Sequence, residues 1–172
     1  MKRAVAFLSA VAAILACIPL FGCIQHTHIV ITSREIGDFY CSVYEDQTLE
    51  IIKYMGDDEI VAIPAKMGEY EIVGISTRAF YNRAKVKEVY LPSTIKELPA
   101  KLFDGCPDLE AIYIPATVTK IGKNLVSDCP SFDLVRYAGT EKQWNSIPKG
   151  TALTENYAIT AAEKVYEFVV GD

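Results

Sequence analysis

The chain has 172 residues, of which 51% are apolar and 23% are charged, and its formal net charge is −5. This length and composition fit one globular domain with a short appendage. The acidic balance opposes nucleic-acid binding, which needs clustered Lys and Arg to neutralise phosphates, and it provides no basic patch for anionic lipid.

Residues 1–22 have the layout of an export signal. A basic "MKR" precedes the apolar run "AVAFLSAVAAILACIPLF", and the small residue Gly22 follows. Pro19 interrupts the run, so the segment is marginal as a membrane-spanning helix, which needs about 20 apolar residues. We therefore assign residues 1–22 to a signal peptide.

The end of this segment, "LFGC", resembles the lipobox of bacterial lipoproteins, whose cysteine is acylated and becomes the new N-terminus. The resemblance implies lipidation of Cys23, with Cys17 in "ILAC" as the alternative and an ordinary signal helix as a third possibility. Acyl chains hold a protein to a membrane without a spanning helix. The expected product is an exported protein, lipid-anchored to the bacterial cell membrane and facing the extracellular or periplasmic side, with residues 23–37 as a polar tether.

Residues 38–172 are expected to form the folded domain. Its first part, 38–56, contains "DFYCSVYEDQTLEIIKY", with period-two alternation on both sides of a polar turn, which predicts a β-hairpin cap. Further along, "MGEY" places a tight turn at Gly68, and this turn accommodates five extra residues as a second, small hairpin.

The region 57–148 contains a repeat of 23 residues, most regular at 79–101, 102–124 and 125–147. Apolar residues recur at the same places in each segment, and an incomplete unit precedes them, in which Ile72 and Ile75 match Ile95 and Leu98. The main columns are Phe80, Phe103 and Val126; Val86, Leu109 and Phe132; Val89, Ile112 and Val135; Leu91, Ile114 and Tyr137.

One 23-residue coil has an apolar interior that it cannot bury alone. Parallel strands about 4.8 Å apart would turn each column into a buried ladder. Within a coil, we expect Leu109, Ile112 and Ile114 to face inward and Ala111 and Tyr113 to face outward. Pro115 then ends the strand because it has no N–H to donate.

The C-terminal part is expected to cover the last coil, with 149–172 as a cap. Thr140 and Gln143 form a capping-box pattern that begins a short helix, and Trp144 falls in register with Ile121, where its indole would close the core. The tail, residues 154–170, satisfies either a strand or a two-turn helix. We expect a final strand.

The pattern LxxIxIPxxVxxIGxxxFxxCxxL over residues 38–148 resembles the BspA-like, or treponemal-type, leucine-rich repeats, which occur largely in bacterial surface proteins. Pro99, where the family usually has the glycine seen at Gly122, and Ala138, in place of proline, depart from it. The resemblance implies an α+β, mostly β fold: a short solenoid of about three to four 23-residue coils with an N-terminal β-hairpin cap and a C-terminal cap.

Residues suited to catalysis or metal binding are scarce. His26 and His28 are the only histidines and lie in the tether, so no Ser-His-Asp or Cys-His nucleophile can form in the repeats. The pair also lacks the third and fourth ligands of a metal site. A pair of carboxylates remains conceivable for a hydrolase. We expect no enzyme activity, no cofactor and no metal.

The cysteines of the domain are interpreted as buried thiols. Cys106 and Cys129 share one column of adjacent coils, so a disulfide is geometrically possible in an exported protein. Packing as small apolar groups is the favoured interpretation for both residues, and also for Cys41 on the hairpin.

The outward side of the repeated strand is the candidate partner-binding face. Its column contains Tyr90, Tyr113 and Arg136, with Glu88 alongside, and tyrosine and arginine are enriched in binding hot spots. The prediction is an adhesin-like module that binds an extracellular protein or glycan without catalysis and meets the membrane through its lipid anchor. The alternatives are a structural or scaffolding component of an envelope complex and, less favoured, a carboxylate-dependent hydrolase.

Overall fold

The computed structural model describes residues 29–149 and 156–168. The signal segment, the two candidate anchor cysteines and both histidines lie outside the described residues, as do parts of the C-terminal cap. Within the described ranges, no helix is long and apolar enough to cross a membrane.

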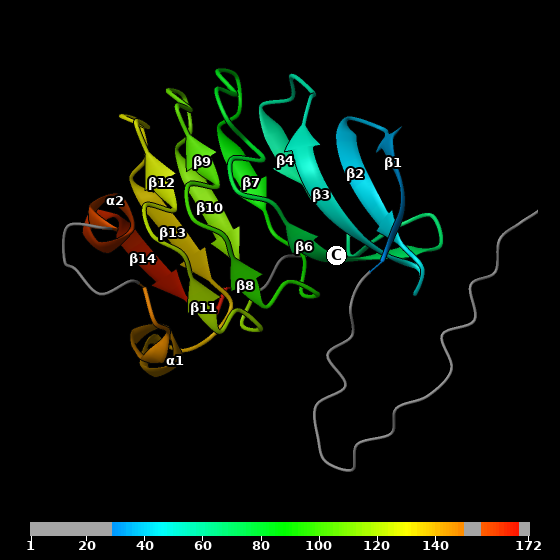
Figure 1. The fold of residues 1–172 in the computed structure, drawn as a ribbon. Coiled ribbons are helices and arrows are strands. Elements are labelled where there is room, and N and C mark those ends of the chain that lie inside the picture. The colour runs from blue at the N-terminus through cyan, green and yellow to red at the C-terminus, as the bar shows by residue number, and fades with distance from the viewer. Residues whose placement is uncertain (1–28, 150–155, 169–172) are drawn as a thin grey trace, which may run out of the picture.

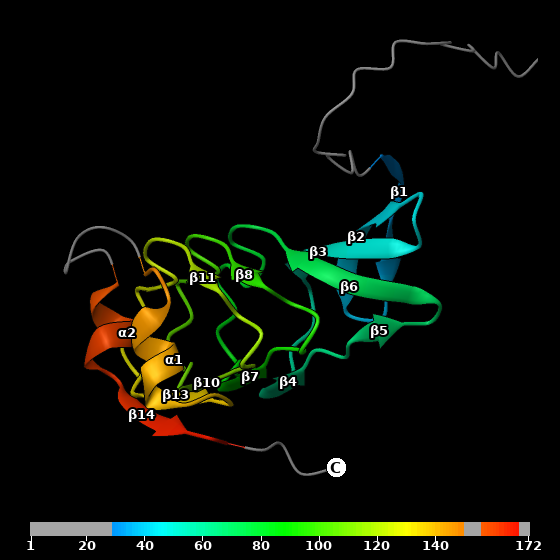
Figure 2. The same cartoon turned by 90° about the horizontal axis from the view of Figure 1, so that it is seen from below.

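The repeats form coils with three short sides, stacked along one axis (Figures 1 and 2). Two successive coils contribute three strands each, and equivalent strands pair in parallel. The first coil has β7 (Glu88–Tyr90), β8 (Glu97–Leu98) and β9 (Phe103–Asp104). The second has β10 (Ala111–Ile114), β11 (Lys120–Ile121) and β12 (Val126–Ser127).

The largest row of strands is a parallel sheet with the order β14-β13-β10-β7-β4. Its other members are β4 (Ile60–Ala62), β13 (Leu134–Tyr137) and β14 (Glu163–Tyr166). Val61, Val89, Ile112 and Val135 pair in register across this sheet and are all buried. Leu109 is also fully buried, and Phe132 is half-buried against the same core. The expected ladders of like side chains are therefore confirmed.

The N-terminal end of the stack is a second sheet with the order β1-β2-β3-β6-β5. Both expected hairpins are present: β2 (Phe39–Tyr44) pairs antiparallel with β3 (Thr48–Tyr54), and β5 (Lys66–Met67) with β6 (Tyr70–Ile75). Gly68 has a φ of 64°, the left-handed conformation that this turn requires. Strand β3 also pairs in parallel with β6, which joins the hairpin to the coils.

The segment expected as a polar tether contains a strand, β1 (Val30–Ile36), which pairs antiparallel with β2. Six of its seven residues are exposed, so β1 is held by backbone hydrogen bonds to the edge of β2 and not by burial of an apolar face. The tether interpretation of 23–37 therefore fails for residues 30–36, because no hydrophobic alternation marks this pairing.

The C-terminal end differs from a regular coil (Figure 2). Helix α1 (Glu141–Ser146) begins with the predicted capping box of Thr140 and Gln143, and Trp144 is buried in the core as expected. The tail contains both of the alternatives considered: α2 (Tyr157–Ala161) and then β14, which pairs in parallel with β13. The expected final strand is present, but it is shorter than the tail.

Two positions of the repeat, the glycine Gly122 and the departure Ala138, have local explanations. Gly122 lies against the preceding coil, where an added Cβ would stand 2.4 Å from the backbone nitrogen of Ala100. Ala138, at a position where the earlier coils have proline, donates its backbone N–H to the carbonyl of Ile114. A proline could not make this bond.

Candidate functional site

The candidate site is the outer face of the parallel sheet, on the side opposite the core. Tyr90, Tyr113 and Arg136 occupy equivalent positions on β7, β10 and β13 and pair in register. Because the strands are parallel and stacked, their side chains form one row. The structure thus brings together the residues that the sequence placed on this face.

The two tyrosines form a stacked pair that is anchored by one carboxylate. Their ring centroids are 3.6 Å apart with an interplanar angle of 12°. Both hydroxyls donate to Oε2 of Glu88, Tyr90 at 3.0 Å and Tyr113 at 2.9 Å. Glu88 therefore positions both rings.

Ala111 and Tyr113 face outward from the coil, as expected, but solvent hardly reaches them. Both side chains point away from the core, but they are buried, with 3% and 7% of their surface exposed. Phe168 covers part of this face, with its ring centroid 5.2 Å from that of Tyr113. Burial, followed by the contacts with Tyr90 and Glu88, raises the pKa of Tyr113.

Phe168 is the residue of this face that sequence reasoning missed. It follows β14, and the chain turns at Glu167, whose φ of 56° is left-handed. The backbone N–H of Glu167 donates to the carbonyl of Gly139, which holds the turn against the preceding coil. The apolar "FVV" at the end of the tail was the available signal, but its position depends on the pairing of β14 with β13.

Arg136 contacts two neighbouring aromatic rings. Its guanidinium carbon is 5.4 Å from the ring centroid of Tyr113 and 5.1 Å from that of Phe168, within the range of cation–π attraction. Its Nε atom is buried and has no hydrogen-bond partner among the described residues. The rings therefore orient the guanidinium but do not neutralise its charge.

Next to this row is a groove of about 410 Å³ at the carboxyl ends of β7, β10 and β13. Its walls are mainly apolar. They include Leu91, Tyr113, Ile114, Pro115, Arg136 and Phe168. None of the residues that line the groove is a carboxylate.

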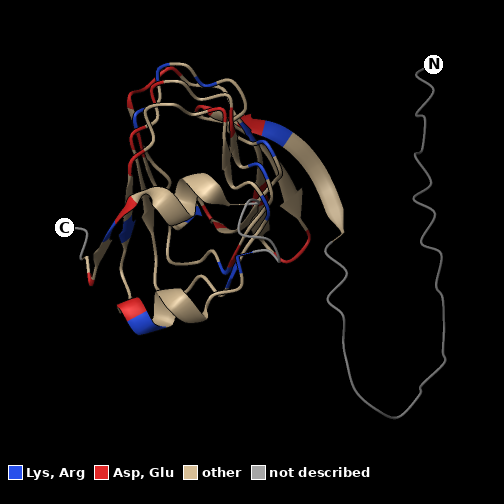
Figure 3. Cartoon of the chain, turned by 90° about the vertical axis from the view of Figure 1, so that its left-hand side faces the viewer, with Lys and Arg blue, Asp and Glu red and all other residues tan. Residues whose placement is uncertain are grey.

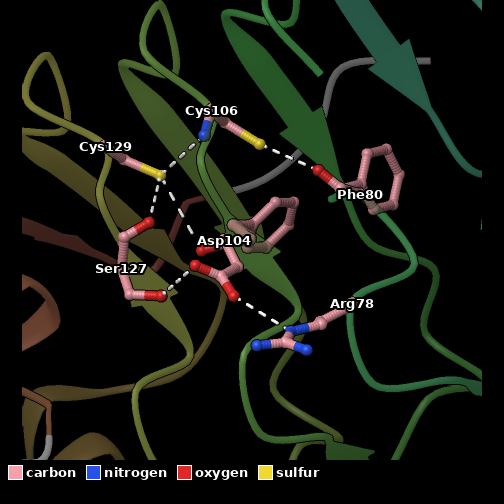
Figure 4. A network of polar contacts seen from close by, with 7 residues as sticks. Arg78, Phe80, Asp104, Cys106, Ser127 and Cys129 are labelled. Carbon is pink, nitrogen blue, oxygen red and sulfur yellow. Dashed lines mark hydrogen bonds and ion pairs between the residues drawn. The ribbon is translucent and has the colours of Figure 1, made fainter. Parts of the chain in front are cut away.

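A second polar cluster lies on another side of the coils (Figure 4). Arg78 Nε donates to Oδ2 of the buried Asp104 at 3.0 Å, and Ser127 Oγ donates to Oδ1 at 2.9 Å. These residues come from three successive coils. The buried carboxylate of Asp104 therefore links three coils of the stack.

The cysteines next to this cluster are free thiols (Figure 4). Cys106 Sγ donates to the carbonyl of Phe80, and the backbone N–H of Cys106 donates to Cys129 Sγ at 3.4 Å. The contact with Cys129, together with burial, raises the pKa of Cys106. Cys41 is fully buried. These contacts agree with thiols that pack in the core.

Metal-binding and nucleic-acid-binding features are not found in the part of the chain that the structure describes. No group of three or more His, Cys, Asp or Glu residues is placed to hold a metal ion there. Figure 3 shows acidic and basic residues interspersed along the coils, and no continuous basic face stands out on the described residues.

The geometry defines a class of protein, a stacked β-solenoid with a parallel strand face. A family profile described as "BspA type Leucine rich repeat region" matches residues 66–151 in six copies. This match covers half of the chain, which therefore belongs to the BspA-type leucine-rich repeat family, as the residue pattern predicted.

One of the similar solved structures supports the fold. A leucine-rich repeat protein from Bacteroides capillosus has a TM-score of 0.61 at 15% identity, over 79% of this chain and 99% of that one. The T. pallidum leucine-rich repeat protein has a TM-score of 0.48 at 18% identity, over 78% of this chain and 64% of that one. A leucine-rich cell surface protein from Faecalibacterium prausnitzii has a TM-score of 0.40 at 22% identity, over 70% and 43%. No curated protein matches the chain.

Proposed function

We propose that this chain is an exported, lipid-anchored repeat protein that binds a protein or glycan outside the cell, without catalysis. The family supports a repeat protein that binds other proteins. The anchor is assigned to Cys23, with Cys17 as the alternative, on the sequence pattern alone.

One observation carries the binding role: the row of Tyr90, Tyr113 and Arg136 beside an apolar groove. Aromatic rings and arginine are the side chains that contribute most to protein interfaces, and they do so best beside pockets that exclude water. Here Glu88 and Phe168 hold the row in place before any partner arrives. A pre-ordered face loses less side-chain entropy on binding.

The hydrolase alternative has less support. A carboxylate pair must flank the reacting bond, one member as acid and the other as base or nucleophile. Glu88 already accepts two hydroxyl hydrogen bonds, and no described residue that lines the groove beside it is a carboxylate. A scaffolding role in an envelope complex remains the second candidate, because it would use the same face for a permanent partner.

The binding role is tested with residues 24–172 as bait against host secretions and envelope extract. The double variant Tyr90→Ala, Arg136→Gln should lose the captured partner and keep a wild-type circular dichroism spectrum, with a lower melting temperature because Tyr113 loses two contacts. Glu97→Gln, on another side of the coils, is the matched control and should keep the partner. Equal capture by wild type and the double variant would remove this face from the proposal.

The anchor is tested separately by expressing the full chain with Cys23→Ala or Cys17→Ala. The first change should release the protein from the membrane fraction, and the second should not. The intact mass of the native N-terminal peptide identifies the acylated residue. The opposite pattern would move the anchor to Cys17, and membrane retention of both variants would end the lipidation proposal.

A further inference from the structure

Arg136 differs from the basic side chains of the coils that form ion pairs. Four ion pairs among the described residues each join a basic side chain to an acidic one. They are Arg78 with Asp104, Lys85 with Asp57, Lys87 with Glu59, and Lys120 with Glu97. Arg136 has no carboxylate partner among the described residues, and its guanidinium contacts two aromatic rings at the edge of a groove. A half-buried cation without a counter-ion favours an anionic ligand.

The walls of the groove indicate which chemical groups should lie next to the anionic group of the ligand. Leu91, Ile114, Pro115 and Ala138 present apolar surface. Polar side chains among the lining residues are limited to Ser93, Tyr113 and Arg136, and the Tyr113 hydroxyl already donates to Glu88. A sugar needs many hydrogen-bond partners, and this groove offers few. The surface fits a ligand with one carboxylate next to an aliphatic group.

We propose that the groove binds an extended peptide segment of the partner protein, with a carboxylate on the Arg136 guanidinium and a neighbouring aliphatic side chain against Leu91 and Ile114. The inference rests on the proposed binding role of this face and names its ligand. The carboxylate belongs either to an Asp or Glu side chain or to a chain terminus. Charge complementarity carries the assignment, since a guanidinium presents its donors in the geometry that a carboxylate accepts.

The test begins with two random nonapeptide libraries selected on residues 24–172, one with blocked ends and one with a free terminal carboxylate. Selected peptides should contain an acid beside Leu, Ile or Val. Enrichment in the blocked library assigns a side-chain carboxylate, and enrichment restricted to the other library assigns a chain terminus. Selection of peptides without an acid would overturn the proposal.

A double-mutant cycle then locates the contact. We would titrate the tightest-binding peptide against wild type and Arg136→Gln. The same titrations are repeated with a peptide in which the acid is neutralised, as Asp→Asn, Glu→Gln or a terminal amide. Each single change should weaken binding at least about tenfold, and the double change should cost little more, because both remove the same contact. Lys120→Gln is the control and should leave affinity unchanged. Additive losses would overturn the assignment to Arg136.

Other occupants of the groove give different results. Tighter binding of a uronic-acid oligosaccharide than of any selected peptide would assign the site to glycans. A dimer that Arg136→Gln dissociates in sedimentation would assign it to a second copy of the chain. An affinity gain of more than about tenfold on removal of residues 169–172 would assign it to the chain's own end. Each of these overturns the peptide proposal.

Failure of this proposal can be told from failure of the proposed function. If the partner captured from extracts still requires Tyr90 and Arg136 but no acidic peptide binds, the face keeps its function and only the ligand class is wrong. If neither the partner nor the peptides depend on this face, both proposals fall together.

Discussion

Two arginines of the stack, Arg78 and Arg136, lie in contrasting surroundings. Arg78 is half exposed yet has a buried carboxylate partner, Asp104, which also accepts from Ser127. Arg136 is less exposed and contacts two aromatic rings but no acid among the described residues. A charge with an internal partner stabilises the fold, whereas a charge held without one is available to a ligand. The comparison thus separates a structural cluster from a binding surface.

The largest expected effect comes from removing the ring that supports Arg136. Tyr113→Ala deletes a buried aromatic group that contacts Tyr90, Phe168 and the guanidinium, and we expect it to lower the free energy of unfolding by about 3 kcal/mol. Urea denaturation measures the loss. Tyr113→Phe keeps the ring and removes only the bond to Glu88, so its cost should be about 1 kcal/mol. Equal costs for both variants would show that the ring packing contributes little.

Alkaline pH should weaken the strand face through the same residue. Burial raises the pKa of Tyr113 in the folded state, so the folded chain holds this proton more tightly than the unfolded chain, where the pKa is about 10. The stabilisation is complete below pH 10 and is lost as the pH rises above it. Urea midpoints measured from pH 8 to pH 11 should therefore fall, and Tyr113→Phe should flatten the fall. An identical slope in the variant would contradict the assignment.

Neutralising Asp104, the partner of Arg78, should lower the free energy of unfolding and leave ligand binding intact. Asp104→Asn weakens two hydrogen bonds of a buried carboxylate, and we expect a loss of about 2 kcal/mol in unfolding free energy. The exposed pair of Lys120 and Glu97 is the matched control, and Glu97→Gln should cost less than about 0.5 kcal/mol. Thermal melts distinguish the two. If Asp104→Asn melts at the wild-type temperature, the cluster contributes nothing measurable to stability.

Adding an acid beside Arg136 should change stability little, and it tests the contrast between the two arginines directly. Ser93→Asp places a carboxylate in the groove and gives Arg136 the kind of partner that Arg78 already has. We expect a stability change within about 1 kcal/mol, because exposed pairs contribute little. Binding of an acidic peptide should nevertheless fall by about tenfold, since the new acid competes for the guanidinium. Ser93→Asn controls for size, and equal binding by both variants would argue against Arg136 as the anion site.

The repeats show how much of the fold follows from sequence. Ile112 and Val135 lie one period apart and meet in adjacent strands, as predicted, because a fixed period brings equivalent residues together in any regular stack. Trp144 closes the core for the same reason, although it comes from a helix. The row of Tyr90, Tyr113 and Arg136 was predictable too, since it follows from the same register.

The parts outside the period were harder to predict. Strand β1 buries almost none of its side chains, so no alternation marked its pairing with β2. The pattern of the tail satisfied either a strand or a two-turn helix, and the structure contains both the helix α2 and the strand β14. Short segments with mixed patterns are decided by the surfaces on which they pack.

The sequence by itself determined the stacked coils, their buried columns and the row of side chains on the outer face, because these features repeat and depend on neighbours one period away. Only the tertiary structure decided that Phe168 covers Tyr113 and that, among the described residues, no acid pairs with Arg136. Both outcomes depend on single contacts that occur once in the molecule, where the turn at Glu167 meets the strand face. A contact that is not repeated leaves no periodic signal in the chain.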